Sequence, residues 1–150
     1  MRHAAAYRHR GRMTTTSTIT DPKIESVQRL YAGYGSGNMA AVVAELADDV
    51  DWAAEAAGHG APWHGLYTGA AEVPRFFEAI GAALDVSEFS IVGFASNDTD
   101  VVATVHWSFT ARATGKTASM YMQHWFKFGD GKIVFFRGSE DSAQSLAALS

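Results

Sequence analysis

Apolar residues recur every three or four positions through much of the first half of the chain, a spacing that predicts helices. One helix is predicted from Pro22, behind a capping acid, to the glycines that begin at Gly33. A second, short helix is predicted from Asn38 to Asp48. A third, with a strongly apolar face, is predicted over Ala70–Leu84.

The period then changes to two, which predicts strands. Val50–Glu55 reads as a short strand, and the glycine-rich residues 56–69 read as a loop that forms a flap or an edge. Four longer strands are predicted further along the chain, at Ser87–Ala95, Val101–Arg112, Lys116–Phe128 and Lys132–Glu140. Their short connections predict antiparallel hairpins. The last ten residues are predicted to form a short helix or a tail.

This order of elements predicts an α+β fold in which helices cover one face of an antiparallel sheet. A cavity between the helices and a curved sheet is where a small molecule would bind. We expect one domain over residues 20–146, with a basic head at 1–19 that is excluded from the fold and a tail at 147–150.

The composition narrows the classes of function. The chain has 150 residues, of which 47% are hydrophobic and 19% charged, as in globular proteins. It has no cysteine, which excludes disulfides, a thiol nucleophile and cysteine-bound metals, and fits a cytoplasmic location. No apolar run approaches the roughly 20 residues of a membrane-spanning helix.

The net charge of −4 combines two unlike parts. Residues 1–13 contain four arginines and no acid, so the rest of the chain has 12 − 4 = 8 basic and 16 acidic side chains, a net charge of −8. This acidic body argues against binding to nucleic acid or to an anionic membrane. The basic head lacks the apolar stretch of a secretory signal, and either Met1 or Met13 is the natural start.

Alternation along the strands predicts which side chains face the cavity. In residues 101–110 the more apolar face contains Trp107, whereas His106 lies on the outward face. In residues 116–128 the apolar, inward face contains Met122, Phe126 and a lone polar residue, His124. Such a histidine is either a hydrogen-bonded core residue or a group that transfers protons to a ligand.

The opposite face of residues 116–128 contains Tyr121, Gln123 and Trp125, an aromatic and polar composition typical of an interface. It predicts a homodimer formed through this outer sheet face. Alternation does not determine which way Arg137 points. It forms either an ion pair with Glu140 or Asp141 or a part of the pocket.

Other candidate chemistry is weaker. Glu55, His59, His64 and His124 could together bind a metal, but they lack a recognised short-range spacing such as HExxH, so no metal site is predicted. No G-x-S-x-G elbow and no phosphate-binding loop is present, so neither a serine nucleophile nor nucleotide binding is predicted.

Three segments together resemble the nuclear-transport-factor-2-like superfamily, and in particular its SnoaL-like branch of polyketide cyclases and ketosteroid isomerase relatives. They are VQRLYAGYGSGN followed by LADDVDW, then GLYTGAAEVPRFFEAI, and finally QHWFKFGDGKIVFFRGSED. The resemblance covers about residues 22–146. It implies a cone-shaped, curved antiparallel sheet wrapped around three N-terminal helices, a dimer, and an internal pocket.

The resemblance does not identify a reaction, because this superfamily includes both enzymes and binding proteins. The catalytic tyrosine position of ketosteroid isomerase falls on Leu30, its base falls near Ala54, and its second acid falls on His124 or Gln123. None of these matches, so steroid isomerisation is not expected. The Asp-Arg-Asp set of limonene epoxide hydrolase has no match on the apolar inward face of residues 101–110. The aspartate and histidine of the related polyketide cyclases could correspond to Asp141 and His124.

Two hypotheses follow. In the first, the protein is a cofactor-independent acid/base enzyme of isomerase, cyclase or dehydratase type that acts on a small apolar carbonyl or polycyclic substrate. His124 would transfer the proton, with Asp141 or Glu55 as its partner. The pocket would be formed by Trp52, Tyr67, Phe77, Trp107, Met122, Phe126 and Arg137. In the second, the protein is a non-catalytic ligand-binding or dimerisation module.

Overall fold

The computed structural model describes residues 20–56 and 60–150. Three helices precede most of the sheet: α1 (Pro22–Gly35), α2 (Met39–Val43) and α3 (Val73–Ala83). Asp21 caps α1 by accepting a hydrogen bond from the backbone N–H of Lys23 at 2.9 Å, and Asn38 caps α2 in the same way. These helices therefore begin where the capping residues predict.

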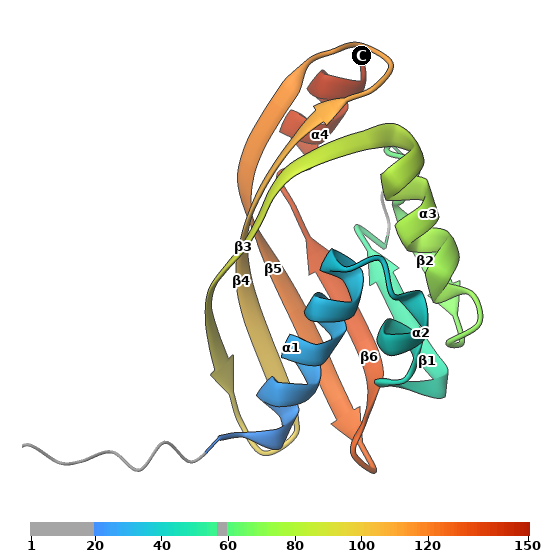
Figure 1. Ribbon diagram of the computed structural model, residues 1–150, viewed down its shortest axis with the longest axis vertical. Coiled ribbons are helices and arrows are strands. Elements are labelled where there is room, and N and C mark those ends of the chain that lie inside the picture. The colour runs from blue at the N-terminus through green and yellow to red at the C-terminus, as the bar shows by residue number, and fades with distance from the viewer. Residues whose placement is uncertain (1–19, 57–59) are drawn as a thin grey trace, which may run out of the picture.

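Six strands form one curved sheet in the order β2-β1-β6-β5-β4-β3 (Figure 1). Their bounds are β1 (Leu46–Ala54), β2 (Gly65–Thr68), β3 (Leu84–Ser96), β4 (Asp100–Ala111), β5 (Thr117–Gly129) and β6 (Lys132–Ser139). All neighbours are antiparallel except β1 and β6, which are parallel. The mixed α+β fold predicted from the sequence is confirmed, with one parallel pair that local patterns could not reveal.

Two predicted boundaries were wrong because sheet pairing overrides the local pattern. The second helix ends at Val43, since Leu46 already pairs with Ile133 and begins β1. The predicted loop at 56–69 contains β2, an edge strand whose Tyr67 pairs with Trp52.

Helices α1, α2 and α3 lie on the concave side of the sheet (Figure 1). The inward face of β4 is buried at every second residue, from Val101 to Phe109, as alternation predicted. The outward prediction for His106 is also confirmed, because its Nδ1 lies 3.0 Å from Glu88 Oε1 on the other face. The helices therefore cover the concave face of the sheet, and the opposite face is exposed to solvent.

A fourth helix, α4 (Ser142–Leu149), closes the chain against the β4–β5 hairpin (Figure 1). Ala148 is buried, and its carbonyl oxygen accepts a hydrogen bond from Thr114 Oγ1 at 2.5 Å. Residues 147–149, which we predicted as a tail, are thus part of the packed helix. The basic head at 1–19 lies outside the described residues.

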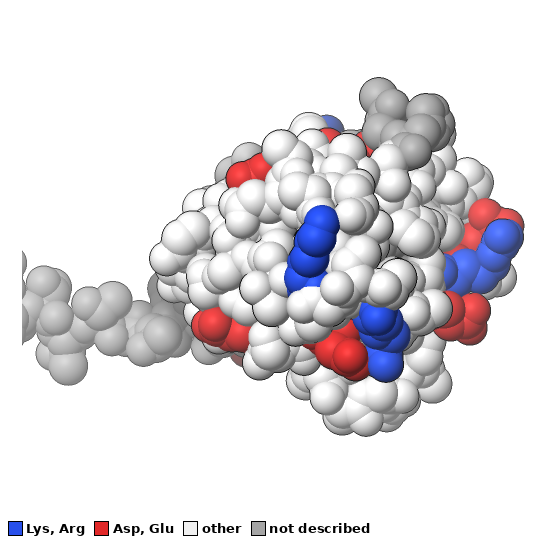
Figure 2. All heavy atoms as spheres, turned by 90° about the horizontal axis from the view of Figure 1, so that it is seen from above, with Lys and Arg blue, Asp and Glu red and all other residues white. Residues whose placement is uncertain are grey.

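None of the helices in the described part of the chain is long and apolar enough to cross a membrane. On the face shown in Figure 2, lysine and arginine side chains are few, most of them lie beside acidic ones, and they do not gather into a basic patch.

Candidate functional site

A cavity of about 50 Å³ lies between α1, α3 and the concave face of the sheet. Eighteen residues line it, and ten of them are phenylalanine, tyrosine or tryptophan. A single water molecule needs roughly 10–15 Å³ of such space, so the cavity has room for a small group without rearrangement. Its wall is therefore a cage of aromatic rings with few polar atoms.

Tyr31 and His124 are two of the polar residues that line the cavity. Tyr31 lies on the buried face of α1, and His124 lies on the inward phase of β5. The phenol oxygen of Tyr31 is 2.8 Å from Nδ1 of His124, a hydrogen bond between residues 93 positions apart. His124 thus has a polar partner, but it is a phenol and not the carboxylate that we expected.

Small neighbours leave space around the His124 ring. In the sheet His124 pairs with Ala103 on one side and with Gly138 on the other. A Cβ at Gly138 would lie 3.0 Å from the ring of Phe136 and 3.7 Å from Cδ2 of His124. Any side chain at this position would therefore crowd the Phe136 ring and contact the imidazole, and glycine avoids this crowding.

The apolar surroundings determine the protonation of this pair. Burial lowers the pKa of the His124 imidazole to about 4, because the charged ring would lose its hydration. Burial likewise raises the pKa of the Tyr31 phenol far above its ordinary value. Both groups are therefore neutral at pH 7.

Two neutral arrangements satisfy this contact. Either the Tyr31 hydroxyl donates to Nδ1 of His124, which leaves the proton on Nε2, or Nδ1–H donates to the phenol oxygen. In the second arrangement, Nε2 is a free base and the Tyr31 hydroxyl proton can be donated to a ligand. The pair can therefore serve as a base and a hydrogen-bond donor at once.

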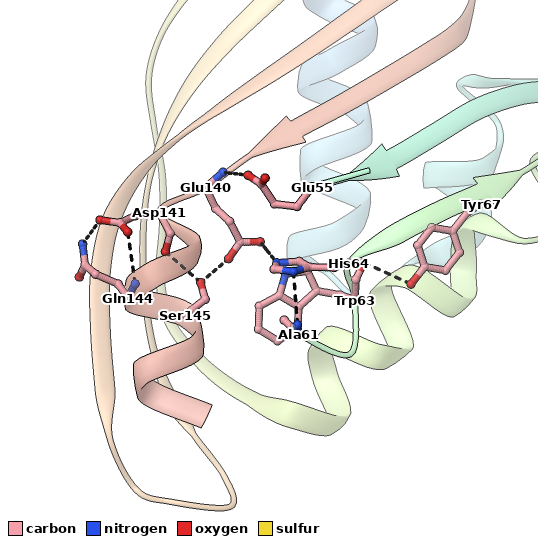
Figure 3. Close-up of polar contacts among 9 residues, drawn as sticks. All are labelled: Glu55, Ala61, Trp63, His64, Tyr67, Glu140, Asp141, Gln144 and Ser145. Atoms are coloured by element: carbon pink, nitrogen blue, oxygen red, sulfur yellow. Dashed lines mark hydrogen bonds and ion pairs between the residues drawn. The ribbon is translucent and has the colours of Figure 1, made fainter. Parts of the chain in front are cut away.

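Another polar residue of the wall is Glu140, which follows β6 (Figure 3). Its Oε1 accepts hydrogen bonds from Trp63 Nε1 at 2.7 Å and from His64 Nε2 at 2.9 Å. Its Oε2 accepts a hydrogen bond from the Ser145 hydroxyl. The side chains of Glu140 and His64 are only 5% and 2% exposed. Glu140 therefore ties the end of β6 to the segment before β2 and to α4.

The proposed acidic partners of His124 lie elsewhere. Glu55 has a left-handed backbone with φ of 43°, and its Oε1 accepts a hydrogen bond from the backbone N–H of Glu140 at 2.9 Å (Figure 3). Asp141 caps α4, where it accepts hydrogen bonds from the backbone and side chain of Gln144. These bonds lower the pKa of the Asp141 carboxyl. Neither acid lines the cavity, so the structure does not bring them together with His124.

Five of the seven side chains that we expected in the pocket line the cavity, namely Trp52, Phe77, Trp107, Met122 and Phe126. The other two do not. Tyr67 packs on Phe76 and donates a hydrogen bond to the backbone oxygen of Trp63 at 3.2 Å. Arg137 lies on the outer face, where it forms an ion pair with Asp51 at 2.9 Å and covers the Phe135 ring. Its partner is therefore Asp51, not Glu140 or Asp141.

Tyr31 and Glu140 are among the wall residues that sequence reasoning did not select as site residues. Tyr31 was visible as part of the apolar face of the first helix, and Glu140 shares its alternation phase with Phe136 and Gly138. Those patterns indicate an inward direction, but they do not reveal the partner across the cavity.

Among the described residues, no three histidine, aspartate or glutamate side chains are grouped so that they could hold a metal ion. His59, one member of the four-residue set considered from the sequence, lies outside the described residues.

The fold and the aromatic cavity define a small-molecule pocket protein with a nuclear-transport-factor-2-like architecture. The model of the SnoaL-like domain matches residues 27–136, and the chain belongs to this family. No curated protein sequence matches the chain.

Solved structures agree on the fold. An NTF2-like protein from Burkholderia thailandensis is similar over 88% of this chain and 99% of its own, with 26% identity and a TM-score of 0.77. TerC, crystallised with polyporic acid, is 20% identical over 86% of this chain and 98% of its own, with a TM-score of 0.78. A proposed polyketide cyclase from Xanthomonas campestris is 21% identical over 86% of this chain and 97% of its own, with a TM-score of 0.70.

Proposed function

We propose that this protein binds a small, flat, largely apolar molecule that carries a carbonyl group, and that Tyr31 and His124 move a proton on it without a cofactor. The observation that carries the proposal is the Tyr31–His124 hydrogen bond within a wall of aromatic rings. The name of the X. campestris neighbour and the ligand crystallised with TerC support a cyclic carbonyl compound as the ligand class.

The proposed reaction begins with the tautomer whose Nε2 is free. Nε2 of His124 takes a proton from the carbon next to the carbonyl, and the electron pair of the broken C–H bond forms an enolate. The Tyr31 hydroxyl donates a hydrogen bond to the developing oxyanion. Return of the proton to a different carbon completes an isomerisation, and the enolate could equally attack within the substrate in a cyclisation.

The depressed basicity of His124 limits the substrate. An imidazole whose pKa is about 4 is a weak base, so it can remove only a proton that is already acidic. We therefore propose 1,3-dicarbonyl compounds and β,γ-unsaturated ketones in place of simple ketones.

Hydrogen–deuterium exchange at the activated carbon tests this reaction. 2-Acetylcyclohexanone, a cyclic 1,3-diketone that stays largely uncharged at neutral pH, would be incubated in D₂O with the wild-type protein, His124→Gln or Tyr31→Phe, and exchange would be followed by proton NMR. We expect each substitution to reduce enzyme-dependent exchange by about 10²-fold, the usual contribution of a positioned acid or base. Unchanged exchange in His124→Gln would refute the proposal, and Phe128→Leu serves as a control outside the cavity wall.

Non-catalytic binding is the second candidate function, and the weak base and small cavity favour it. A ligand that binds only the folded protein raises its stability by RT ln(1 + [L]/Kd). If the same diketone raises the melting temperature in proportion to the logarithm of its concentration but exchanges no protons, the protein is a binder.

We also propose that the chain forms a homodimer in the cytoplasm, through the outer sheet face of Tyr121, Gln123 and Trp125. Tyr121 is 66% exposed and Trp125 38% exposed, which supports an unpartnered aromatic surface. Light scattering after size-exclusion chromatography would detect the dimer. Tyr121→Glu should convert it to a monomer, and an unchanged mass would contradict this interface.

A further inference from the structure

The charge of the cavity wall has a single source. Among the eighteen described residues that line the cavity, Glu140 is the only aspartate, glutamate, lysine or arginine. It lies in the wall with a side chain that is 5% exposed, so little water screens it.

The partners of Glu140 stabilise its negative charge without cancelling it. All three are hydrogen-bond donors from the side chains of Trp63, His64 and Ser145. His64 could cancel the charge only as an imidazolium, but its Nδ1 accepts a hydrogen bond from the backbone N–H of Ala61 at 3.3 Å. An imidazole that accepts at Nδ1 and donates at Nε2 is neutral. The cluster therefore retains the charge of one carboxylate.

The remaining wall also favours positive charge. Aromatic ring faces carry partial negative charge, and such cages recognise ammonium groups. The polar pair of the wall, Tyr31 and His124, adds no cation because both groups are neutral at pH 7. Inside a protein, a carboxylate acts on a ligand charge with a lower effective dielectric than in water.

We propose that Glu140 and the aromatic wall make the cavity selective for ligands that carry a small ammonium group, and that they exclude anionic ligands. This inference rests on the proposed small-molecule binding and adds the charge class of the ligand. It assigns to Glu140 the role of a specificity determinant that is distinct from the proton-transferring pair.

Three compact probes of similar shape test the charge selectivity: tetramethylammonium, tert-butyl alcohol and pivalate. Their dissociation constants for the wild-type protein would be measured by titration calorimetry at constant ionic strength. We expect tetramethylammonium to bind roughly tenfold more tightly than the alcohol, because desolvation of the cation offsets most of the attraction. Pivalate should show no measurable binding.

Glu140→Gln removes the charge while keeping a similar shape, and it should reduce the preference for the cation over the alcohol several-fold, to what the aromatic rings alone provide. Asp141→Asn is the matched control, because it removes the same charge one residue further along, on the exposed cap of α4. The control should keep the wild-type preference. If Glu140→Gln does not fold, the selectivity of the wild-type protein among the three probes decides the question.

Each outcome distinguishes this inference from the proposed function. Equal binding of the alcohol and the cation would overturn the charge selectivity and leave small-molecule binding intact. Binding of pivalate, or loss of the cation preference in Asp141→Asn, would also overturn it. Failure of all three probes to bind would overturn the selectivity, whereas the diketone experiments test the proposed function separately.

Discussion

The histidine in the cavity wall, His124, and the histidine that binds the wall residue Glu140, His64, are held in opposite ways. His64 has both ring nitrogens engaged, one by the backbone N–H of Ala61 and one by the carboxylate of Glu140. His124 has a single hydrogen bond to a neutral phenol, and its ring is surrounded by aromatic side chains. The tautomer of His64 is therefore determined by its surroundings, whereas His124 has two neutral arrangements available.

This difference separates a structural role from a chemical one. A ring with both nitrogens engaged cannot exchange a proton without breaking the contacts that join β6, α4 and the segment before β2. A ring with one exchangeable partner can move a proton and keep its position. The sequence presents the same residue type twice, so the environment distinguishes the roles.

The largest expected effect is a loss of stability when Glu140 is replaced. Glu140→Ala leaves the buried donors of Trp63 and His64 without an acceptor, and should lower the free energy of unfolding by about 3–5 kcal/mol. Urea denaturation followed by circular dichroism measures it. Asp141→Asn is the control, and a loss no greater than in that control would show that the cluster is not structural.

The second effect is on the pH dependence of stability, at His124. The folded-state pKa of about 4 lies below the ordinary value of 6.5, so the unfolded chain binds more protons between these values. The contribution of the neutral His124 to the free energy of unfolding is fully present above pH 6.5. It is lost as the pH falls toward 4, and the loss amounts to about 3 kcal/mol. We expect His124→Gln to lack this component in unfolding measured at several pH values. An identical pH profile in the variant would contradict the burial of a neutral imidazole.

The third effect is the coupling between Tyr31 and His124. Removing either partner leaves the other without its buried hydrogen bond, whereas removing both leaves neither unsatisfied. A double-mutant cycle of Tyr31→Phe and His124→Phe should therefore give an interaction energy of about 1 kcal/mol. Additive effects would indicate that the 2.8 Å contact contributes nothing to folding.

The smallest expected effect on stability is at Arg137, which lies outside the cavity on the same strand as Phe136. Arg137 and Asp51 form an ion pair whose side chains are 27% and 52% exposed, so solvent screens it. Arg137→Gln should lower the free energy of unfolding by about 0.5 kcal/mol or less. A loss of stability close to that of Glu140→Ala would contradict the expectation that this exposed ion pair stabilises the fold less than the buried carboxylate does.

The sequence predicts directions better than partners. Alternation placed Trp107, Met122 and His124 on the inward face because β4 and β5 pair in regular register through this region. It could not orient β6, since a bulge between Lys127 and Phe128 lets Ile133 and Phe136 both become buried despite their opposite phases.

The partners of the site residues depend on contacts over long sequence distances. Glu140 meets His64 across 76 residues, and Tyr31 meets His124 across 93. Asp141 illustrates the limit, because a carboxylate near the end of a strand is equally suited to catalysis and to capping the next helix. In this protein it caps α4.

The distribution of the tryptophans has a practical consequence. Three of the four, Trp52, Trp63 and Trp107, line the cavity, and Trp125 lies on the outer face. Intrinsic fluorescence therefore arises mainly from the wall of the cavity itself. A chain in which Trp125 is replaced by phenylalanine would emit only from that wall, and would report optically on any molecule that enters without a label.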